Sequence, residues 1–210
     1  MHQLTLIDTA ALPPLFILRH GQTEWNLQGR MQGQKNSDLT AKGRDQAAQQ
    51  ARIMAPVLRA TPEMYCVTSP LTRAFDTAAI ALAGQHITVD NRIMETSAGS
   101  WEGRLRTEVI AELPADSGHT ADEGAMFELF LSAPDGESPA DLEARCREFL
   151  LSLTGPTAIV SHGVTAAFLR GLACSLSWDE MTRLSPTQGC VFAISGGVEQ
   201  KMTELEKELL

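Results

Sequence analysis

The stretch Leu15-Phe16-Ile17-Leu18-Arg19-His20-Gly21 decides the fold class of this 210-residue chain. Four apolar residues follow Pro13-Pro14 without a break, and then a guanidinium, an imidazole and a glycine come in succession. A short, continuous apolar run is typical of a strand that is buried on both faces of a sheet. We therefore expect an interior strand here, with the polar residues at its carboxyl end.

The same arrangement returns later in the chain. There Thr157-Ala-Ile-Val160 predicts a second buried strand, which ends at Ser161-His162-Gly163. A third strand is expected at Met64–Thr68, and Ser69-Pro70 is expected to open a helix over Leu71–Leu82 with the serine as its cap. Three strands thus end in polar residues that can carry chemistry.

Apolar residues at helical spacing separate these strands. They predict a helix that begins at Ala41 and ends or kinks at Pro56, because proline removes a helical N–H. Further helices are expected from Ser138-Pro139 and over Val164–Cys174, and a hairpin at a sheet edge around Gly196-Gly197. Strands that alternate with helices predict an α/β fold, with three α/β/α layers around a mostly parallel central sheet.

The composition restricts the function classes. Apolar residues make up 43% and charged residues 20% of the chain, as in ordinary globular domains. A formal net charge of −9 argues against nucleic-acid binding, and no apolar run reaches the ~20 residues of a membrane helix. The first residues lack the basic region of a signal peptide, and the four scattered cysteines are typical of reduced thiols. A cytoplasmic protein without a membrane partner is therefore expected.

The length predicts a single domain over residues 1–210. Within it, the part at about 104–137 mixes short helical patterns with prolines and glycines and is too long for a plain connection. We expect this insert to act as a lid that selects the substrate.

The polar residues at the strand ends predict an anion-binding site. In an open parallel sheet the carboxyl ends of the strands share one edge, and ligands bind there. Arg19, His20 and His162 end two strands, and Arg73 lies in the first turn of a helix whose amino end favours an anion. Two arginines, two histidines and a helix start at one place suit a tetrahedral dianion such as phosphate.

The motif Leu18-Arg-His-Gly-Gln-Thr-Glu-Trp-Asn26 resembles the opening L-R-H-G-[EQ]-[ST]-x-x-N of the histidine phosphatase superfamily, which includes the phosphoglycerate mutases. Further motifs of that family follow in order: Leu39-Thr-x-x-Gly43, Ser69-Pro-Leu-x-Arg-Ala74, Glu95 before Gly99-x-Trp-Glu-Gly103, Gly136-Glu-Ser138 with Asp141 and Arg145, and Ser161-His-Gly163. The resemblance covers the chain from Phe16 to about Ile194.

The resemblance implies a phosphoglycerate-mutase-like fold and a role for each matching residue. His20 is implied to be the nucleophile that forms a phosphohistidine, and Glu95 the proton donor to the leaving group. Arg19, Arg73 and His162 are implied to hold the phosphoryl oxygens, with Asn26 and Gly163 in the same pocket. A protonated His162 is expected to add a third cation, and with so many cations neither a metal ion nor another cofactor is expected.

Several functions stay open at this stage. Hydrolysis of a small phosphorylated metabolite is favoured over a phosphoglycerate mutase, because mutases of the family carry Glu-Arg-His-Tyr-Gly where this chain has Glu95-Thr-Ser-Ala-Gly99. The segment Leu105–Glu137 holds only Arg106 as a cation, which predicts a poor pocket for a second anion. A non-catalytic phosphate-binding or interaction module would lack the nucleophile or the acid, and Arg19 beside His20 disfavours a metal-dependent hydrolase. The expected partner is a small phosphorylated substrate, and the sequence leaves a homodimer open.

Overall fold

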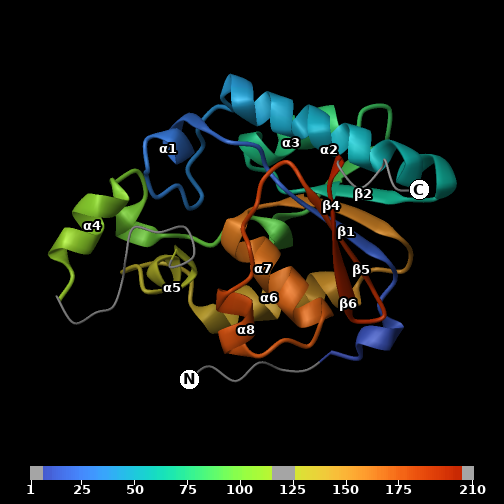
Figure 1. Cartoon of the computed structure of the whole chain (residues 1–210). Coiled ribbons are helices and arrows are strands. Elements are labelled where there is room, and N and C mark those ends of the chain that lie inside the picture. The colour runs from blue at the N-terminus through green and yellow to red at the C-terminus, as the bar shows by residue number, and fades with distance from the viewer. Residues whose placement is uncertain (1–6, 115–125, 205–210) are drawn as a thin grey trace.

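The computed structural model describes residues 7–114 and 126–204, which form a six-stranded sheet between layers of helices (Figure 1). The strands are β1 (Leu15–Arg19), β2 (Tyr65–Thr68), β3 (Ile87–Val89), β4 (Thr157–Ser161), β5 (Val191–Ser195) and β6 (Val198–Met202). Their spatial order is β3-β2-β4-β1-β5-β6. β5 points opposite to the other five strands, so its pairings with β1 and β6 are antiparallel and the remaining pairings are parallel. The mostly parallel sheet is confirmed, as is the hairpin at its edge.

Helices cover both faces of this sheet. α2 (Ala41–Ala60) and α3 (Thr72–Ala81) share one apolar cluster with Leu18 and Val160, whereas α6 (Pro139–Leu151) and α7 (Gly163–Ala173) share another with Ile17 and Ile159. Adjacent residues of one strand enter opposite clusters because successive side chains point to opposite faces. Figure 1 shows the two helix pairs on either side of the sheet, so the α/β/α layers are confirmed.

One helix boundary differs from the prediction. α2 continues through Pro56 to Ala60, so the helix does not end at that proline, and the kink predicted there stays a prediction. The next turn carries Val57 and Leu58, which pack against the apolar cluster shared with α3. Burial of these side chains compensates for the single backbone hydrogen bond that the proline cannot donate.

The insert predicted at about 104–137 contributes two short helices beside the sheet. α4 (Arg106–Glu112) and α5 (Met126–Leu131) flank a small apolar cluster that contains Met31, Trp101 and Leu129. Figure 1 shows α4 set off to one side of the layered part. Residues 115–125 of the insert lie outside the described residues.

The remaining short elements lie in the connections. They are α1 (Glu24–Leu27), α8 (Trp178–Thr182) and the 3-10 turns η1 (Thr9–Ala11), η2 (Asn91–Ile93) and η3 (Gly99–Trp101). Across the described ranges, no helix combines the length and the apolar character needed to cross a membrane.

All four cysteines are free thiols, as predicted. Burial raises the pKa of Cys146 to about 12 and that of Cys66 to about 11. Both thiols therefore stay protonated at neutral pH and pack as small apolar groups.

Candidate active site

The histidines that follow β1 and β4 lie next to each other. The two strands are parallel neighbours in which Arg19 pairs with Ser161, so His20 and His162 leave the sheet at the same level. The backbone N–H of His20 donates to the Ser161 carbonyl at 3.0 Å. The imidazole centroids are 5.2 Å apart, with 57° between the ring planes. The structure thus brings the two His-Gly strand ends together, as predicted.

Of the two ring nitrogens of His20, Nδ1 is held by a hydrogen bond and Nε2 has an available lone pair. Its Nδ1 lies 2.8 Å from the carbonyl oxygen of Gly21. A carbonyl can only accept, so Nδ1 carries the proton and Nε2 keeps its lone pair. Burial, and then the charges of Arg73 and Arg19, hold the pKa of His20 well below its usual value. The ring is therefore the neutral base that a nucleophile must be.

His162 is fully buried, whereas His20 is 3% exposed. The Nε2 of His162 is 2.7 Å from the Ser69 hydroxyl, while its buried Nδ1 has no hydrogen-bond partner among the described residues. Burial, followed by the charges of Arg73 and His20, lowers the pKa of His162 well below its usual value. This direction disfavours the protonated His162 that the sequence predicts, first because the ring is buried and then because Arg73 is charged.

Two guanidinium groups supply positive charge at the site. Arg73, in the first turn of α3, is 1% exposed and donates to the carbonyls of Lys35 and Gly33, both at 2.7 Å. Burial lowers the pKa of Arg73 to about 10, which leaves it charged at neutral pH. Its buried Nε has no hydrogen-bond partner within the described part of the chain. Arg19 donates to the Pro186 carbonyl.

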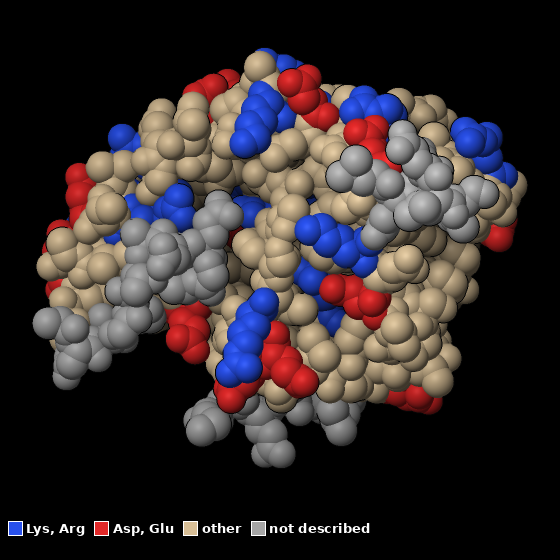
Figure 2. Space-filling model, viewed as in Figure 1, with Lys and Arg blue, Asp and Glu red and all other residues tan. Residues whose placement is uncertain are grey.

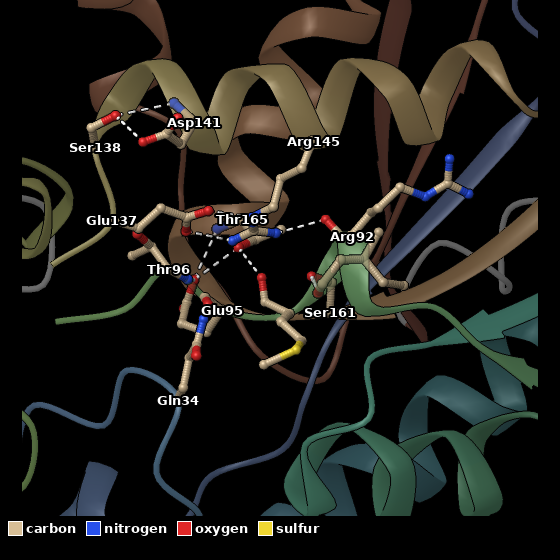
Figure 3. A network of polar contacts seen from close by, with 12 residues as sticks. Gln34, Arg92, Glu95, Thr96, Glu137, Ser138, Asp141, Arg145, Ser161 and Thr165 are labelled. Atoms are coloured by element: carbon tan, nitrogen blue, oxygen red, sulfur yellow. Dashed lines mark hydrogen bonds and ion pairs between the residues drawn. The ribbon is translucent and has the colours of Figure 1, made fainter. Parts of the chain in front are cut away.

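Glu95 is held by the amino end of α7 (Figure 3). Its Oε1 accepts hydrogen bonds from the N–H groups of Thr96 and Thr165, both at 3.0 Å, and lies 3.1 Å from the Thr165 hydroxyl. Its Oε2 accepts from the Val164 N–H at 3.2 Å. The first N–H groups of a helix lack partners inside the helix and favour a carboxylate. Oε1 is thus crowded with donors, and Oε2 is the oxygen better placed to exchange a proton.

One cavity gathers most of the predicted site. Among the described residues, its walls include Arg19, His20, Asn26, Arg73, Glu95 and Gly163, but not His162. Asn26 is held there through its Oδ1, which accepts from the Thr23 N–H at 3.2 Å and from Gln188 at 3.4 Å. Six of the seven predicted site residues therefore line one cavity.

The same cavity holds more positive charge than the sequence suggested. Arg30 and Arg106 both line it, together with Phe127 and Phe130. Arg30 comes from the loop after α1, outside the insert, so a count of cations within the insert alone was too low. The expectation of a poor pocket for a second anion rested on Arg106 alone, and the cavity adds Arg30 to it. Figure 2 shows basic and acidic side chains interspersed over one face, with blue Lys or Arg atoms at the hollow near its centre.

The amino end of α3 contributes Arg73 to the cavity, and part of its backbone is already hydrogen-bonded. Leu71, at the cap position, donates its N–H to the Ser69 hydroxyl at 3.3 Å, and Thr72 donates its N–H to Asn36 at 3.0 Å. Ser69 does not cap α3, since the extended Leu71 occupies the cap position. Its hydroxyl bonds to His162 instead, which makes Ser69 a site residue that the sequence analysis missed.

Thr165 was missed as well. The sequence places it in the first turn of a helix that follows a buried strand, which is a signal for an acceptor at its N–H. Which acceptor binds there depends on a loop about 70 residues away in the chain, between β3 and η3, and local patterns do not show that approach.

Comparisons with known proteins agree with this geometry. The family model of the histidine phosphatase superfamily (branch 1) matches residues 15–205. A glucosyl-3-phosphoglycerate phosphatase of Mycolicibacterium vanbaalenii is 35% identical over 177 residues, which cover 79% of this chain and 76% of that protein. A probable phosphoglycerate mutase of Salmonella arizonae is 33% identical over 179 residues, which cover 79% and 77%. A solved mycobacterial glucosyl-3-phosphoglycerate phosphatase in complex with VO3 has a TM-score of 0.72 at 29% identity, over 91% of this chain and 97% of that one.

Proposed function

We propose that this chain, which belongs to the histidine phosphatase superfamily and is a phosphatase of small metabolites, cleaves phosphomonoesters through a phosphohistidine at His20 and without a metal ion. The observation that carries the proposal is the state of the His20 ring. Its Nδ1 is fixed on the Gly21 carbonyl, its Nε2 keeps a lone pair, and two guanidinium charges act on it. A buried neutral imidazole beside two cations is prepared to attack a dianion.

The first step transfers the phosphoryl group to the protein. The lone pair of His20 Nε2 forms a bond to phosphorus while the bond from phosphorus to the ester oxygen breaks. Arg19 and Arg73 stabilise the charge on the equatorial oxygens, and Arg73 Nε is a donor available for one of them. The acid form of Glu95 gives its proton to the departing alkoxide, which leaves as an alcohol, and Glu95 becomes the carboxylate that the backbone N–H groups hold.

The second step returns His20 to its first state. The Glu95 carboxylate takes a proton from water, the water oxygen bonds to phosphorus, and the bond from phosphorus to Nε2 breaks. Orthophosphate leaves, and Glu95 is protonated again. Each residue thus ends the cycle in the state in which it began.

The donor set suits an anion and not a cation. The groups that surround the reacting position are two guanidiniums and an imidazole, and the nearby carboxylate of Glu95 already accepts three backbone N–H bonds. Positive charge at fixed positions can stabilise the transferring phosphoryl group as a metal ion does elsewhere.

The substrate that fits the cavity carries a second anionic group. Arg30 and Arg106 lie in the same cavity as His20, and Phe127 and Phe130 add apolar surface from the insert. Arg106, Phe127 and Phe130 belong to the predicted insert, which supports its role in choosing the substrate. A carboxylate is the natural partner of a guanidinium, which it binds through charge-assisted hydrogen bonds. The substrate class is therefore a small phosphomonoester with a carboxylate.

O-phosphoserine and O-phosphoethanolamine test this choice, because they differ only by the carboxylate. We expect wild type to prefer O-phosphoserine by about tenfold or more in kcat/KM, since a charged hydrogen bond contributes roughly 1.5–3 kcal/mol. Arg106→Gln should remove much of that preference. Arg104→Gln is the matched control, because Arg104 pairs with the exposed Glu112. Equal use of both substrates by wild type contradicts the carboxylate subsite and leaves the hydrolysis itself in place.

The activity itself is tested by phosphate release after exhaustive chelation. We expect full activity without divalent ions and strong inhibition by vanadate, which adopts the five-coordinate geometry of the transferring group. A mutase would instead return the phosphoryl group to a second hydroxyl of the substrate, which phosphorus NMR of the products distinguishes from orthophosphate. Since the four cysteines are free thiols, we place the reaction in the reducing cytoplasm.

A further inference from the structure

The motif around Glu137 and Arg145 has no part in the reaction described above. Arg145, in α6, binds both carboxylate oxygens of Glu137, with Nε to Oε1 at 2.6 Å and Nη2 to Oε2 at 2.8 Å. The two side chains are only 17% and 15% exposed. A half-buried ion pair contributes little net stability by itself, because both charges lose hydration. The contacts of the pair with other residues indicate its role.

Arg145 touches the chain segment that carries Glu95 (Figure 3). Its third donor, Nη1, binds the Arg92 carbonyl at 2.6 Å. The next three carbonyls, of residues 93, 94 and 95, each accept a hydrogen bond from another side chain. The donors are Ser161 at 2.9 Å, Thr165 at 2.7 Å and Gln34 at 3.3 Å. Four successive carbonyls of an irregular segment are thus held by side chains, in place of the partners that a helix or sheet would provide.

Glu137 touches the same segment on the other side of Glu95. Its backbone N–H donates to the Ser97 carbonyl at 3.1 Å. The approach is close at Gly136 too, where an added Cβ would lie 2.7 Å from the Ser97 oxygen. The ion pair therefore joins two anchor points, one three residues before the acid and one two residues after it.

We propose that the Arg145–Glu137 ion pair is a positioning unit that sets the place of the Glu95 carboxylate relative to the leaving oxygen. The inference rests on the proposed role of Glu95 as proton donor. Neither residue of the pair lines the cavity as described, so neither touches the substrate. Proton transfer depends steeply on placement, and a shift of about 1 Å in a catalytic group can cost about 10²-fold in rate. Holding the backbone at residues 92 and 97 limits such a shift.

The leaving group provides a readout that a merely structural role does not move. An alkyl phosphate expels an alkoxide that needs the proton, whereas p-nitrophenyl phosphate expels a stable phenolate that barely needs it. In single-turnover formation of the phosphoenzyme, we expect Arg145→Gln to lower the rate about tenfold or more with an alkyl phosphate and less than about twofold with p-nitrophenyl phosphate. The double variant that carries both Glu95→Gln and Arg145→Gln should form the phosphoenzyme as fast as Glu95→Gln alone.

Arg170 offers a matched control with the same bonding pattern. It binds Glu199 through two hydrogen bonds at 2.6 and 2.7 Å and donates to the Ser185 carbonyl at 2.8 Å. Arg170→Gln should affect both substrates by the same factor, and its effect should multiply with that of Glu95→Gln. Glu137→Gln serves as the milder variant if Arg145→Gln does not fold, since it keeps the bond from Arg145 to Arg92.

Hydrogen exchange gives a readout that is independent of activity. The Thr96 and Thr165 N–H groups bind the Glu95 carboxylate, so we expect faster exchange at Thr96 in Arg145→Gln and wild-type exchange there in Arg170→Gln. Unchanged exchange at Thr96 in Arg145→Gln overturns the positioning role. So do equal rate losses of Arg145→Gln on both substrates, if Glu95→Gln still loses more with the alkyl phosphate. Either outcome leaves the proposed function intact. If Glu95→Gln itself shows no selectivity, Glu95 is not the acid, and both proposals fail together.

Discussion

The carboxyl ends of β1 and β4 are alike in sequence and different in use. Both end in His-Gly, and both histidines are buried and neutral. His20 lines the cavity and fixes its Nδ1 on the carbonyl of Gly21, the next residue. His162 is fixed through Nε2 by Ser69, which follows the end of β2. The repeated motif therefore places two imidazoles side by side, of which His20 lines the cavity.

The backbone that follows each histidine explains the difference. After β1 the chain runs through a loop before α1 begins at Glu24, so the His20 ring stands at an open edge. After β4 the helix α7 begins at once, and its first N–H groups bind the Glu95 carboxylate. One strand end thus delivers the proposed nucleophile, and the other delivers the donors that hold the proposed acid.

The largest effect is expected from removing one imidazole at a time. His20→Ala should reduce turnover to background and abolish the acid-labile phosphoenzyme, because the attacking nitrogen is gone. His162→Ala should lower the rate by about 10², because it removes the ring that packs beside His20 and so misplaces the attacking nitrogen, while the phosphoenzyme still forms. Labelled phosphate trapped on each variant measures both. If His20→Ala still formed a phosphoenzyme, His162 at the other strand end would be the nucleophile.

The next effect concerns the acid that the β4 end holds. Glu95→Gln keeps the side-chain shape but cannot give up a proton, so we expect a loss of about 10²–10⁴ in phosphoenzyme formation from alkyl phosphates. The loss with p-nitrophenyl phosphate should be much smaller. Single-turnover rates separate this step from the later attack by water. Equal losses on both substrates would transfer the acid role to another group, with Glu102 as the first to test.

The sequence predicted the strand ends well because their signals are local. Apolar runs that stop at His-Gly specify where β1 and β4 end, and parallel pairing then brings His20 and His162 together. The partners of the site could not be predicted in the same way. Ser69, Thr165 and Arg30 reach their positions through contacts between segments far apart in the chain. The lowered pKa of His162 could not be predicted from the sequence either, since burial beside Arg73 is a property of the folded site.

A smaller effect on stability distinguishes the two glycines of the paired motifs. A Cβ on Gly21 would lie 2.1 Å from the Gly43 carbonyl oxygen, a backbone atom that cannot move aside cheaply. A Cβ on Gly163 would lie 3.5 Å from the Arg19 guanidinium carbon, which is an ordinary contact. Urea unfolding should therefore show a loss of about 1–3 kcal/mol for Gly21→Ala and a change within about 0.5 kcal/mol for Gly163→Ala. Equal losses would show that both strand ends are packed against backbone.

The smallest effect is a dependence of stability on pH that both histidines share. The unfolded chain protonates a histidine near pH 6.5, and both folded pKa values are lowered. Below about pH 6.5 the unfolded state therefore binds protons that the folded state does not, and the free energy of unfolding decreases as the pH falls. Each histidine contributes at most about 1.4 kcal/mol per pH unit.

Two variants and a control measure how much each buried histidine contributes to the slope of unfolding free energy against pH. His20→Asn and His162→Asn should each flatten the slope of unfolding free energy between about pH 6.5 and 5, because each removes one buried neutral imidazole. His86→Asn, which replaces an exposed histidine, is the matched control. Urea unfolding at half-unit pH steps measures all three against wild type. If only one of the buried histidines flattens the slope, the other is already charged in the folded protein. Such a result for His162 would restore it as a third cation and would end the equivalence of the two imidazoles.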